Sequence, residues 1–150
     1  MKYALLVGIG YVNTRHALEG PLRDVYKIKE TLVDYECTII TDHTQLLPTK
    51  KLIVEAFLEL LQKKGPLFFY YSGHGQEEGI FCADQEILTH DEFRKMLETM
   101  TIRQPWLRYW IRVLAETCLT LRINGPVNGT KSAQILLDMS FLSVVHKKMN

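Results

Sequence analysis

Three short apolar runs, separated by two amphipathic segments, constrain the fold of this chain more than any other feature. The runs cover residues 3–9, 37–41 and 66–72, and the amphipathic segments cover 20–33 and 48–64. Runs this short and this apolar are typical of strands buried on both faces of a parallel sheet. Connecting such strands through helices needs right-handed crossovers, which place helices on both faces of the sheet. The sequence therefore predicts an α/β fold with a mainly parallel sheet.

The same alternation predicts the order of the strands. With both crossovers right-handed and the glycine-containing loops on a common edge, the first strand lies between the other two, in the order 2-1-3. A further helix is expected over residues 89–100, after a short irregular stretch. The chain has 150 residues and shows no repeat, low-complexity tract or linker, so we expect one domain over residues 1–150.

Charge and cysteine usage argue against several functional classes. A formal net charge of +1 gives no reason to expect nucleic acid or an anionic membrane as a partner. Cys37, Cys82 and Cys118 lie far apart, without the CxxC spacing of a zinc or redox site, so no metal site is expected from them. An odd, sparse cysteine count without a secretory leader predicts reduced thiols and a cytoplasmic location.

The segment after the third apolar run carries the most informative motif. In an open parallel sheet, catalytic residues collect beyond the carboxyl ends of the strands. Here the three expected strands are followed by segments 8–20, 41–45 and 72–79. The last segment reads SGHGQEEG and places His74 between two glycines, whose backbone can adopt positive φ and approach a substrate closely. An imidazole can accept a proton from a thiol near neutral pH. A turn histidine without a catalytic role is the alternative for the bare GHG tripeptide.

The residues around this motif resemble the caspase and metacaspase cysteine peptidases. FFYYSGHGQEEG, preceded by YALLVGIGYVN and LEGPLRDVYKIKETL, is similar to the metacaspase pattern of a first strand, an L-x-G-x-x-x-D helix start and a YSGHG segment. Caspases carry a related SHG-x-EEG-I segment. The resemblance covers residues 2 to about 98. It implies the caspase-like three-layer fold and a p20-type domain, of which residues 101–150 are atypical.

The resemblance also implies a reaction and a set of site residues. In the family's endopeptidase chemistry a cysteine thiolate attacks a peptide carbonyl, His74 would move the proton, and backbone N–H groups including that of Gly75 would bind the oxyanion. Metacaspases cleave after Arg or Lys, and Asp24 and Ser72 match positions of their acidic primary pocket. A carboxylate paired with a guanidinium is a strong, directional contact. The alternative for Asp24 is a first-turn helix aspartate favoured by the helix dipole. The implied partners are peptide or protein substrates.

Carboxylates gather around the last expected helix: Asp84, Glu86, Asp91 and Glu92. Many metacaspases are activated by calcium through acidic loops, so this group could form a weak Ca²⁺ site. Thr89 and Glu92 would also form a capping box at the helix start without any metal, and this is the interpretation we favour. No other cofactor is expected.

The family's nucleophile is harder to find. It belongs to a D-x-C-x-S-G stretch some distance after the histidine, and Cys118 in Glu-Thr-Cys mimics that stretch only loosely. The small residues that should follow are replaced by residues 119–121, Leu-Thr-Leu. Residues 135–140 resemble a strand end with Ser140 at the nucleophile's place, but they come late in the chain.

The genetic code suggests one reason for this mismatch. Codons compatible with residues 110–124, read so that each new codon starts on a third base, permit the run LDSCFSG, the family's missing segment. One hypothesis is that the tail from about residue 101 is out of frame and the chain is inactive; the other is that the tail is genuine and divergent. An active peptidase using Cys118, and a pseudo-peptidase that regulates a related peptidase chain by binding, remain alternatives.

These hypotheses carry structural expectations. We expect His74 to be partly exposed, near Asp24 and Ser72. If the tail is out of frame, the sheet edge beside the third strand should stay open and prone to aggregation. The aromatic residues Trp106, Tyr109 and Trp110 should then be exposed, and Cys118 should lie too far from His74 for proton transfer.

Overall fold

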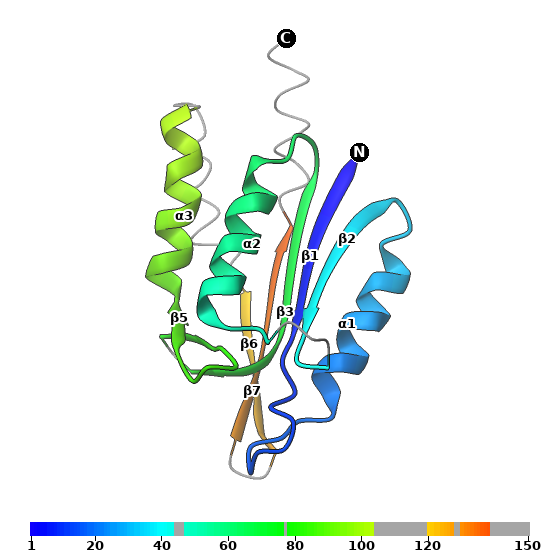
Figure 1. Ribbon diagram of the computed structural model, residues 1–150, viewed down its shortest axis with the longest axis vertical. Helices are drawn as coiled ribbons and strands as arrows, with labels where there is room; N and C mark the ends of the chain where they lie inside the picture. Colours follow the sequence, from blue (N-terminus) through cyan, green and yellow to red (C-terminus); the bar gives the residue numbers. More distant parts are fainter. Residues whose placement is uncertain (44–46, 77, 104–119, 128–129, 139–150) are drawn as a thin grey trace.

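The computed structural model describes residues 1–43, 47–76, 78–103, 120–127 and 130–138 (Figure 1). The helices and strands follow one another as β1 (Lys2–Gly8), α1 (Gly20–Thr31), β2 (Tyr35–Thr41), α2 (Lys50–Gln62), β3 (Leu67–Gln76), β4 (Gly79–Phe81), β5 (Ile87–Thr89), α3 (His90–Arg103), β6 (Thr120–Val127) and β7 (Thr130–Asp138). Among the described residues no helix has both the length and the apolar character needed to cross a membrane.

The first three strands form the centre of the sheet. β1 pairs in parallel with β2 on one side and with β3 on the other, so Gly8 lies opposite both Thr41 and Ser72. The order β2-β1-β3 confirms the predicted 2-1-3 arrangement. Because the three strands run in the same direction, the segments that follow them meet at one edge of the sheet.

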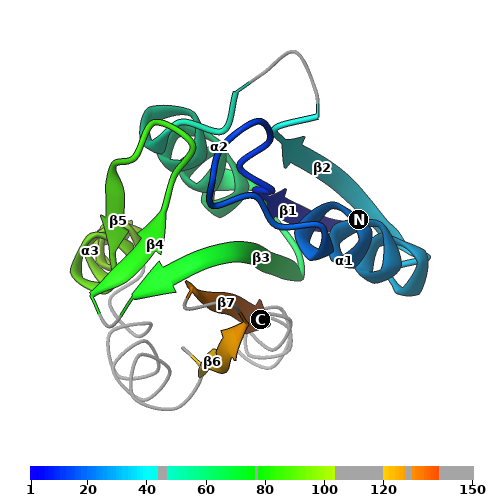
Figure 2. The same cartoon turned by 90° about the horizontal axis from the view of Figure 1, so that it is seen from below.

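Helices cover both faces of this sheet, as the strand–helix alternation predicts. α1 lies on one side and α2 and α3 on the other (Figure 2). Alternate residues of each strand face opposite helices, so Leu5 and Phe69 pack towards α2 and α3 while Leu6 and Phe68 pack towards α1. The larger core includes three aromatic rings with centroids 5.2–5.6 Å apart, those of Phe57, Phe69 and Phe93. Both faces of the sheet are therefore closed by packed side chains.

The segment that carries His74 is a strand, which corrects the expectation of a glycine loop. β3 continues to Gln76, and Gly75 and Gln76 pair with the antiparallel strand β4. β4 pairs in turn with β5, so the stretch expected to be irregular is a hairpin that joins β3 to α3. Ladder hydrogen bonds to β4 keep the backbone extended where the sequence alone indicated a turn.

The edge of β3 beside this hairpin is occupied, which contradicts the expected open edge. β7 pairs antiparallel with β3 from Phe68↔Asp138 to His74↔Ser132, and β6 pairs antiparallel with β7. The reason is that residues 130–138 supply a complementary row of backbone groups along the whole exposed edge. The complete sheet is therefore mixed, with a parallel centre and antiparallel additions. The strand end expected near 135–140 corresponds to the end of β7, whereas Ser140 lies outside the described residues.

Candidate active site

His74 lies near the end of β3 and is buried, with 7% of its surface exposed. The expectation of a partly exposed histidine is therefore wrong. The cause is the segment after β1, which folds over the imidazole. The ring centroid of Tyr11 lies 4.5 Å from that of His74, and the ring of His16 lies edge-on at 6.3 Å. Sequence reasoning missed this cover because it depends on contacts between the loop after β1 and the distant strand β3.

A backbone carbonyl orients the imidazole of His74. Its Nε2 atom lies 2.6 Å from the carbonyl oxygen of His16. A carbonyl oxygen can only accept a hydrogen bond, so Nε2 carries the hydrogen and, in the neutral ring, Nδ1 is the atom that accepts a proton. A base held by a third group in this way is the arrangement that activates a nucleophile in covalent catalysis.

The loop that supplies this carbonyl is anchored by Asp42, a residue that follows β2. Its two carboxylate oxygens accept hydrogen bonds from the backbone N–H groups of Gly10, at 3.0 Å, and Val12, at 3.2 Å. Tyr11, between them, has a φ of 52°, which is unusual for a residue other than glycine. An aspartate directly after the second strand, at the edge where catalysis is expected, is the signal that could have identified this anchor from the sequence.

Asp24 and Ser72 lie together, as the resemblance implies. The Ser72 hydroxyl donates a hydrogen bond of 3.0 Å to Asp24 Oδ2, and Ser72 is 4% exposed. Asp24 lies outside the first turn of α1, so a simple helix-dipole role does not account for it. Burial, followed by the charge of Asp24, raises the pKa of neighbouring Tyr70 to about 12. Ser72 and His74 project from the same face of β3 because they are two residues apart.

The two glycines around His74 have different surroundings from those expected. Neither Gly73 nor Gly75 adopts positive φ. A Cβ atom at Gly73 would instead overlap the hydroxyl of Tyr71, so this glycine is needed for close approach and not for an unusual backbone angle. Gly75 lies opposite Ile80 of β4.

Neither cysteine within the described residues has the properties of a thiolate nucleophile. Burial raises the pKa of Cys37, and it raises the pKa of Cys82 to about 12, with the charge of Asp84 adding to the effect. A raised pKa leaves a thiol protonated near neutral pH, whereas a nucleophile needs the thiolate. Cys118 lies outside the described residues, as do Trp106, Tyr109 and Trp110, so expectations about them stay predictions.

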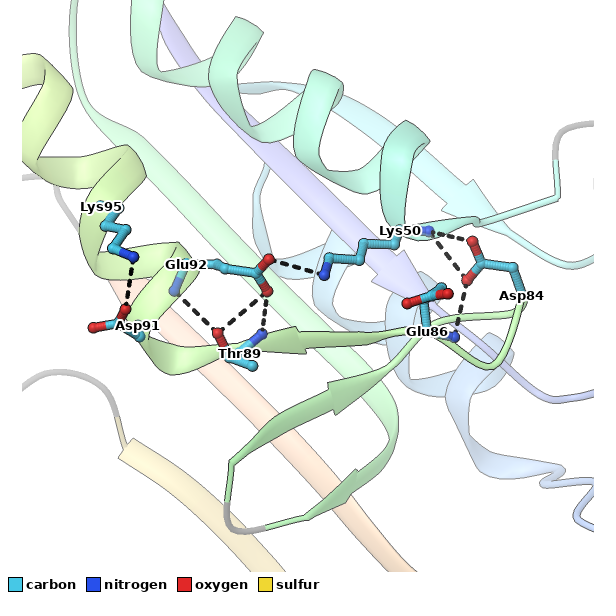
Figure 3. A network of polar contacts seen from close by, with 7 residues as sticks. All are labelled: Lys50, Asp84, Glu86, Thr89, Asp91, Glu92 and Lys95. Carbon is cyan, nitrogen blue, oxygen red and sulfur yellow. Dashed lines mark hydrogen bonds and ion pairs between the residues drawn. The ribbon is translucent and has the colours of Figure 1, made fainter.

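Three of the four carboxylates near α3, those of Asp84, Asp91 and Glu92, contact other protein groups (Figure 3). Thr89 and Glu92 form the predicted capping box, with each side chain accepting the backbone N–H of the other. Glu92 also pairs with Lys50 at 2.8 Å, and this contact lowers the pKa of Glu92 and raises that of Lys50. Asp84 accepts the backbone N–H of Lys50 at the start of α2 and that of Glu86. In the part of the chain that the structure describes, no group of three or more His, Cys, Asp or Glu residues is arranged to hold a metal ion.

Comparison with known proteins shows the family to which this sequence belongs. The caspase domain family matches residues 1–105. Metacaspase-6 from Arabidopsis thaliana is 31% identical over 142 residues, which cover 78% of this chain and 37% of that protein. Metacaspase-7 from the same plant is 34% identical over 122 residues, which cover 65% of this chain and 30% of that protein. Metacaspase-1 from Candida albicans is 35% identical over 85 residues, which cover 49% of this chain and 19% of that protein. The chain thus spans well under half the length of these curated relatives.

Proposed function

Because this chain belongs to the caspase family and is a metacaspase-like peptidase domain, we propose that His74 is its general base. We also propose that the domain recognises peptides at Arg or Lys. The observation that carries the proposal is the contact between His74 Nε2 and the carbonyl oxygen of His16. It orients the ring with the hydrogen on Nε2, so that in the neutral ring Nδ1 is the basic nitrogen that would take a proton from a thiol. In the same scheme, the N–H of Gly75 contributes to binding the oxyanion.

The pairing of Asp24 with Ser72 supports the preference for basic residues. Asp24 is half-buried and its partner Ser72 is buried, so a carboxylate is held at a position only partly open to solvent. A guanidinium that reached this carboxylate could form two parallel hydrogen bonds, which is a stronger contact than a lysine ammonium or a neutral amide would make. The substrates in this proposal are peptides or proteins in a cytoplasmic setting, where free thiols such as Cys37 and Cys82 stay reduced.

We also propose that His74 has no thiolate to activate in this chain, so that the domain binds peptides without cleaving them. Both described cysteines have raised pKa values, and residues 110–124 permit the family's LDSCFSG run only when read out of frame. A domain with a substrate pocket and no thiolate would act as a pseudo-peptidase that binds a substrate or a related peptidase chain. An active peptidase that uses Cys118 is the competing proposal.

A labelling experiment separates these proposals. A short peptide ending in an arginine chloromethyl ketone would be incubated with the full chain, with and without calcium, and the labelled residue located by mass spectrometry. We expect reversible, competable binding without label on Cys118 and no hydrolysis of Arg- or Lys-containing peptides. Label on Cys118, together with turnover abolished by Cys118→Ala, would show that the chain is an active peptidase. The nucleotide sequence between codons 95 and 125 tests the frame of the tail directly.

A further inference from the structure

Two tyrosine hydroxyls contact the backbone of His74 from different parts of the chain. The Tyr71 hydroxyl donates to the carbonyl oxygen of His74 at 2.7 Å, and the N–H of His74 donates to the Tyr11 hydroxyl at 3.3 Å. The two hydroxyls are themselves 3.3 Å apart. Both backbone polar groups of the histidine are therefore bonded to side chains.

A backbone carbonyl of β4 also contacts both hydroxyls, and it determines which group donates in each hydrogen bond. The carbonyl oxygen of Phe81 lies 2.6 Å from the Tyr11 hydroxyl and 3.0 Å from the Tyr71 hydroxyl. Each tyrosine has one hydrogen to donate. If Tyr11 donates to Phe81 and Tyr71 donates to His74, the Tyr11 oxygen is free to accept the N–H of His74. Every donor then has an acceptor at hydrogen-bonding distance.

The environment keeps both tyrosines in the protonated form that these bonds need. Tyr71 is fully buried and Tyr11 packs against the core. Burial raises the pKa of Tyr11 to about 12 and that of Tyr71 well above its usual value. A buried hydroxyl without a partner would be costly, so these bonds stabilise one geometry of the strand end.

Two neighbouring residues, Gly73 and Asp42, accommodate the two tyrosines. Gly73 leaves open the space that the Tyr71 hydroxyl occupies, because a Cβ atom there would overlap it. Asp42 holds the backbone on both sides of Tyr11 through Gly10 and Val12. Gly73 and Asp42 thus help to place the two tyrosines through contacts that do not involve His74.

We propose that Tyr11 and Tyr71 are positioning residues that hold the His74 backbone so that its Nε2 meets the His16 carbonyl and its Nδ1 is presented as the proton acceptor. The position of the ring depends on the position of its Cα atom, and a misplacement of about 1 Å can cost a catalytic site roughly a hundredfold in rate. The inference rests on the proposed role of His74 as general base, but its readout, the tautomer of the ring, does not require turnover.

The test is nitrogen-15 NMR of the histidine rings in the full chain, with His74 assigned by comparison with His74→Ala. We expect the unmodified chain to show one tautomer, with hydrogen on Nε2. Tyr11→Phe and Tyr71→Phe each remove one hydroxyl and keep the ring, so each should give a mixture of tautomers. Tyr3→Phe is the matched control because Tyr3 lies opposite Leu67, at the other end of the sheet, and it should leave the tautomer of His74 unchanged.

The outcomes separate this inference from the proposed function. Hydrogen on Nδ1 in the unmodified chain would contradict both the role of His74 and its positioning. Hydrogen on Nε2 in the unmodified chain and unchanged in both Phe variants would overturn the positioning role alone. Amide spectra would check that each variant is folded. Should Tyr71→Phe fail to fold, Tyr11→Phe decides, since Tyr11 lies in a loop outside the sheet.

Discussion

The hydroxyl of Ser72, in the second half of β3, donates a hydrogen bond of 3.0 Å to the carboxylate of Asp24, in the second turn of α1. The contact fixes the direction of a half-buried carboxylate on the same face of β3 as His74. The residue proposed to select the substrate therefore bonds to the strand that carries the residue proposed to move the proton.

The Asp24 carboxylate should carry most of the preference for basic peptides. Asp24→Asn keeps the shape of the side chain but removes its charge, and a hydrogen bond to a charged group is worth about 1.5–3 kcal/mol. We expect binding of a peptide ending in arginine amide to weaken about ten- to a hundredfold, measured by calorimetric titration. Glu19→Gln, at the N-cap of the same helix, is the control and should change binding little. Equal affinities for Asp24→Asn and the unmodified chain would rule out the pocket.

Gly73→Ala should destabilise the fold. The added methyl group would overlap the Tyr71 hydroxyl, and forced overpacking of this kind costs about 1–3 kcal/mol. Urea denaturation would measure the loss, and the double variant Gly73→Ala, Tyr71→Phe should lose less than the two single variants added together. Gly20→Ala is the matched control, because a Cβ there meets its nearest atom at an ordinary 3.6 Å. An unchanged free energy of unfolding in Gly73→Ala would contradict the close approach.

Asp42→Ala should open the loop over His74. It leaves the N–H groups of Gly10 and Val12 without their acceptors, and each lost bond is worth about 1 kcal/mol. Hydrogen exchange of these two amides should become faster by about tenfold or more, while the amides of β1 stay protected. Asp34→Ala removes an exposed carboxylate whose pair with Lys2 is 3.9 Å long, and it should leave loop exchange unchanged. Loop protection retained in Asp42→Ala would mean that other contacts hold the loop.

The pair between Glu92 and Lys50 should make stability depend on pH at the acid end. Lys50, and then the Thr89 backbone, lower the pKa of Glu92 in the folded chain, so the folded state favours the ionised carboxylate. Its contribution is present above the ordinary glutamate pKa of about 4.3 and is lost as pH falls through the lowered folded value. Glu92→Gln should therefore lose stability at pH 7 and show a flatter acid limb in thermal unfolding. Glu55→Gln, at an exposed position on α2, is the control and should keep the pH dependence of stability of the unmodified chain. If Glu92→Gln also kept that pH dependence, the coupling between Glu92 and Lys50 would be contradicted.

The sequence by itself determined the parallel centre of the sheet, its 2-1-3 order and the helices on both faces. These features follow from apolar periodicity and right-handed crossovers, which act within one strand–helix–strand unit at a time. The capping box of Thr89 and Glu92 was also predictable, because both partners lie within one turn of helix. Family resemblance identified Asp24, Ser72 and His74 as site candidates, and the fold brings the first two into contact.

Only the tertiary structure decided how His74 is surrounded. Its burial, the His16 carbonyl on Nε2 and the two tyrosine hydroxyls depend on a loop after β1 meeting the end of β3 and the β4 strand. The extended backbone of the GHG segment likewise depends on strands β4 and β7, which lie later in the chain. Local patterns cannot predict these features, because the Tyr11 hydroxyl and the His16 carbonyl lie 63 and 58 residues before His74 in the chain. Such bonds form only when packing elsewhere has brought the loops and strands together.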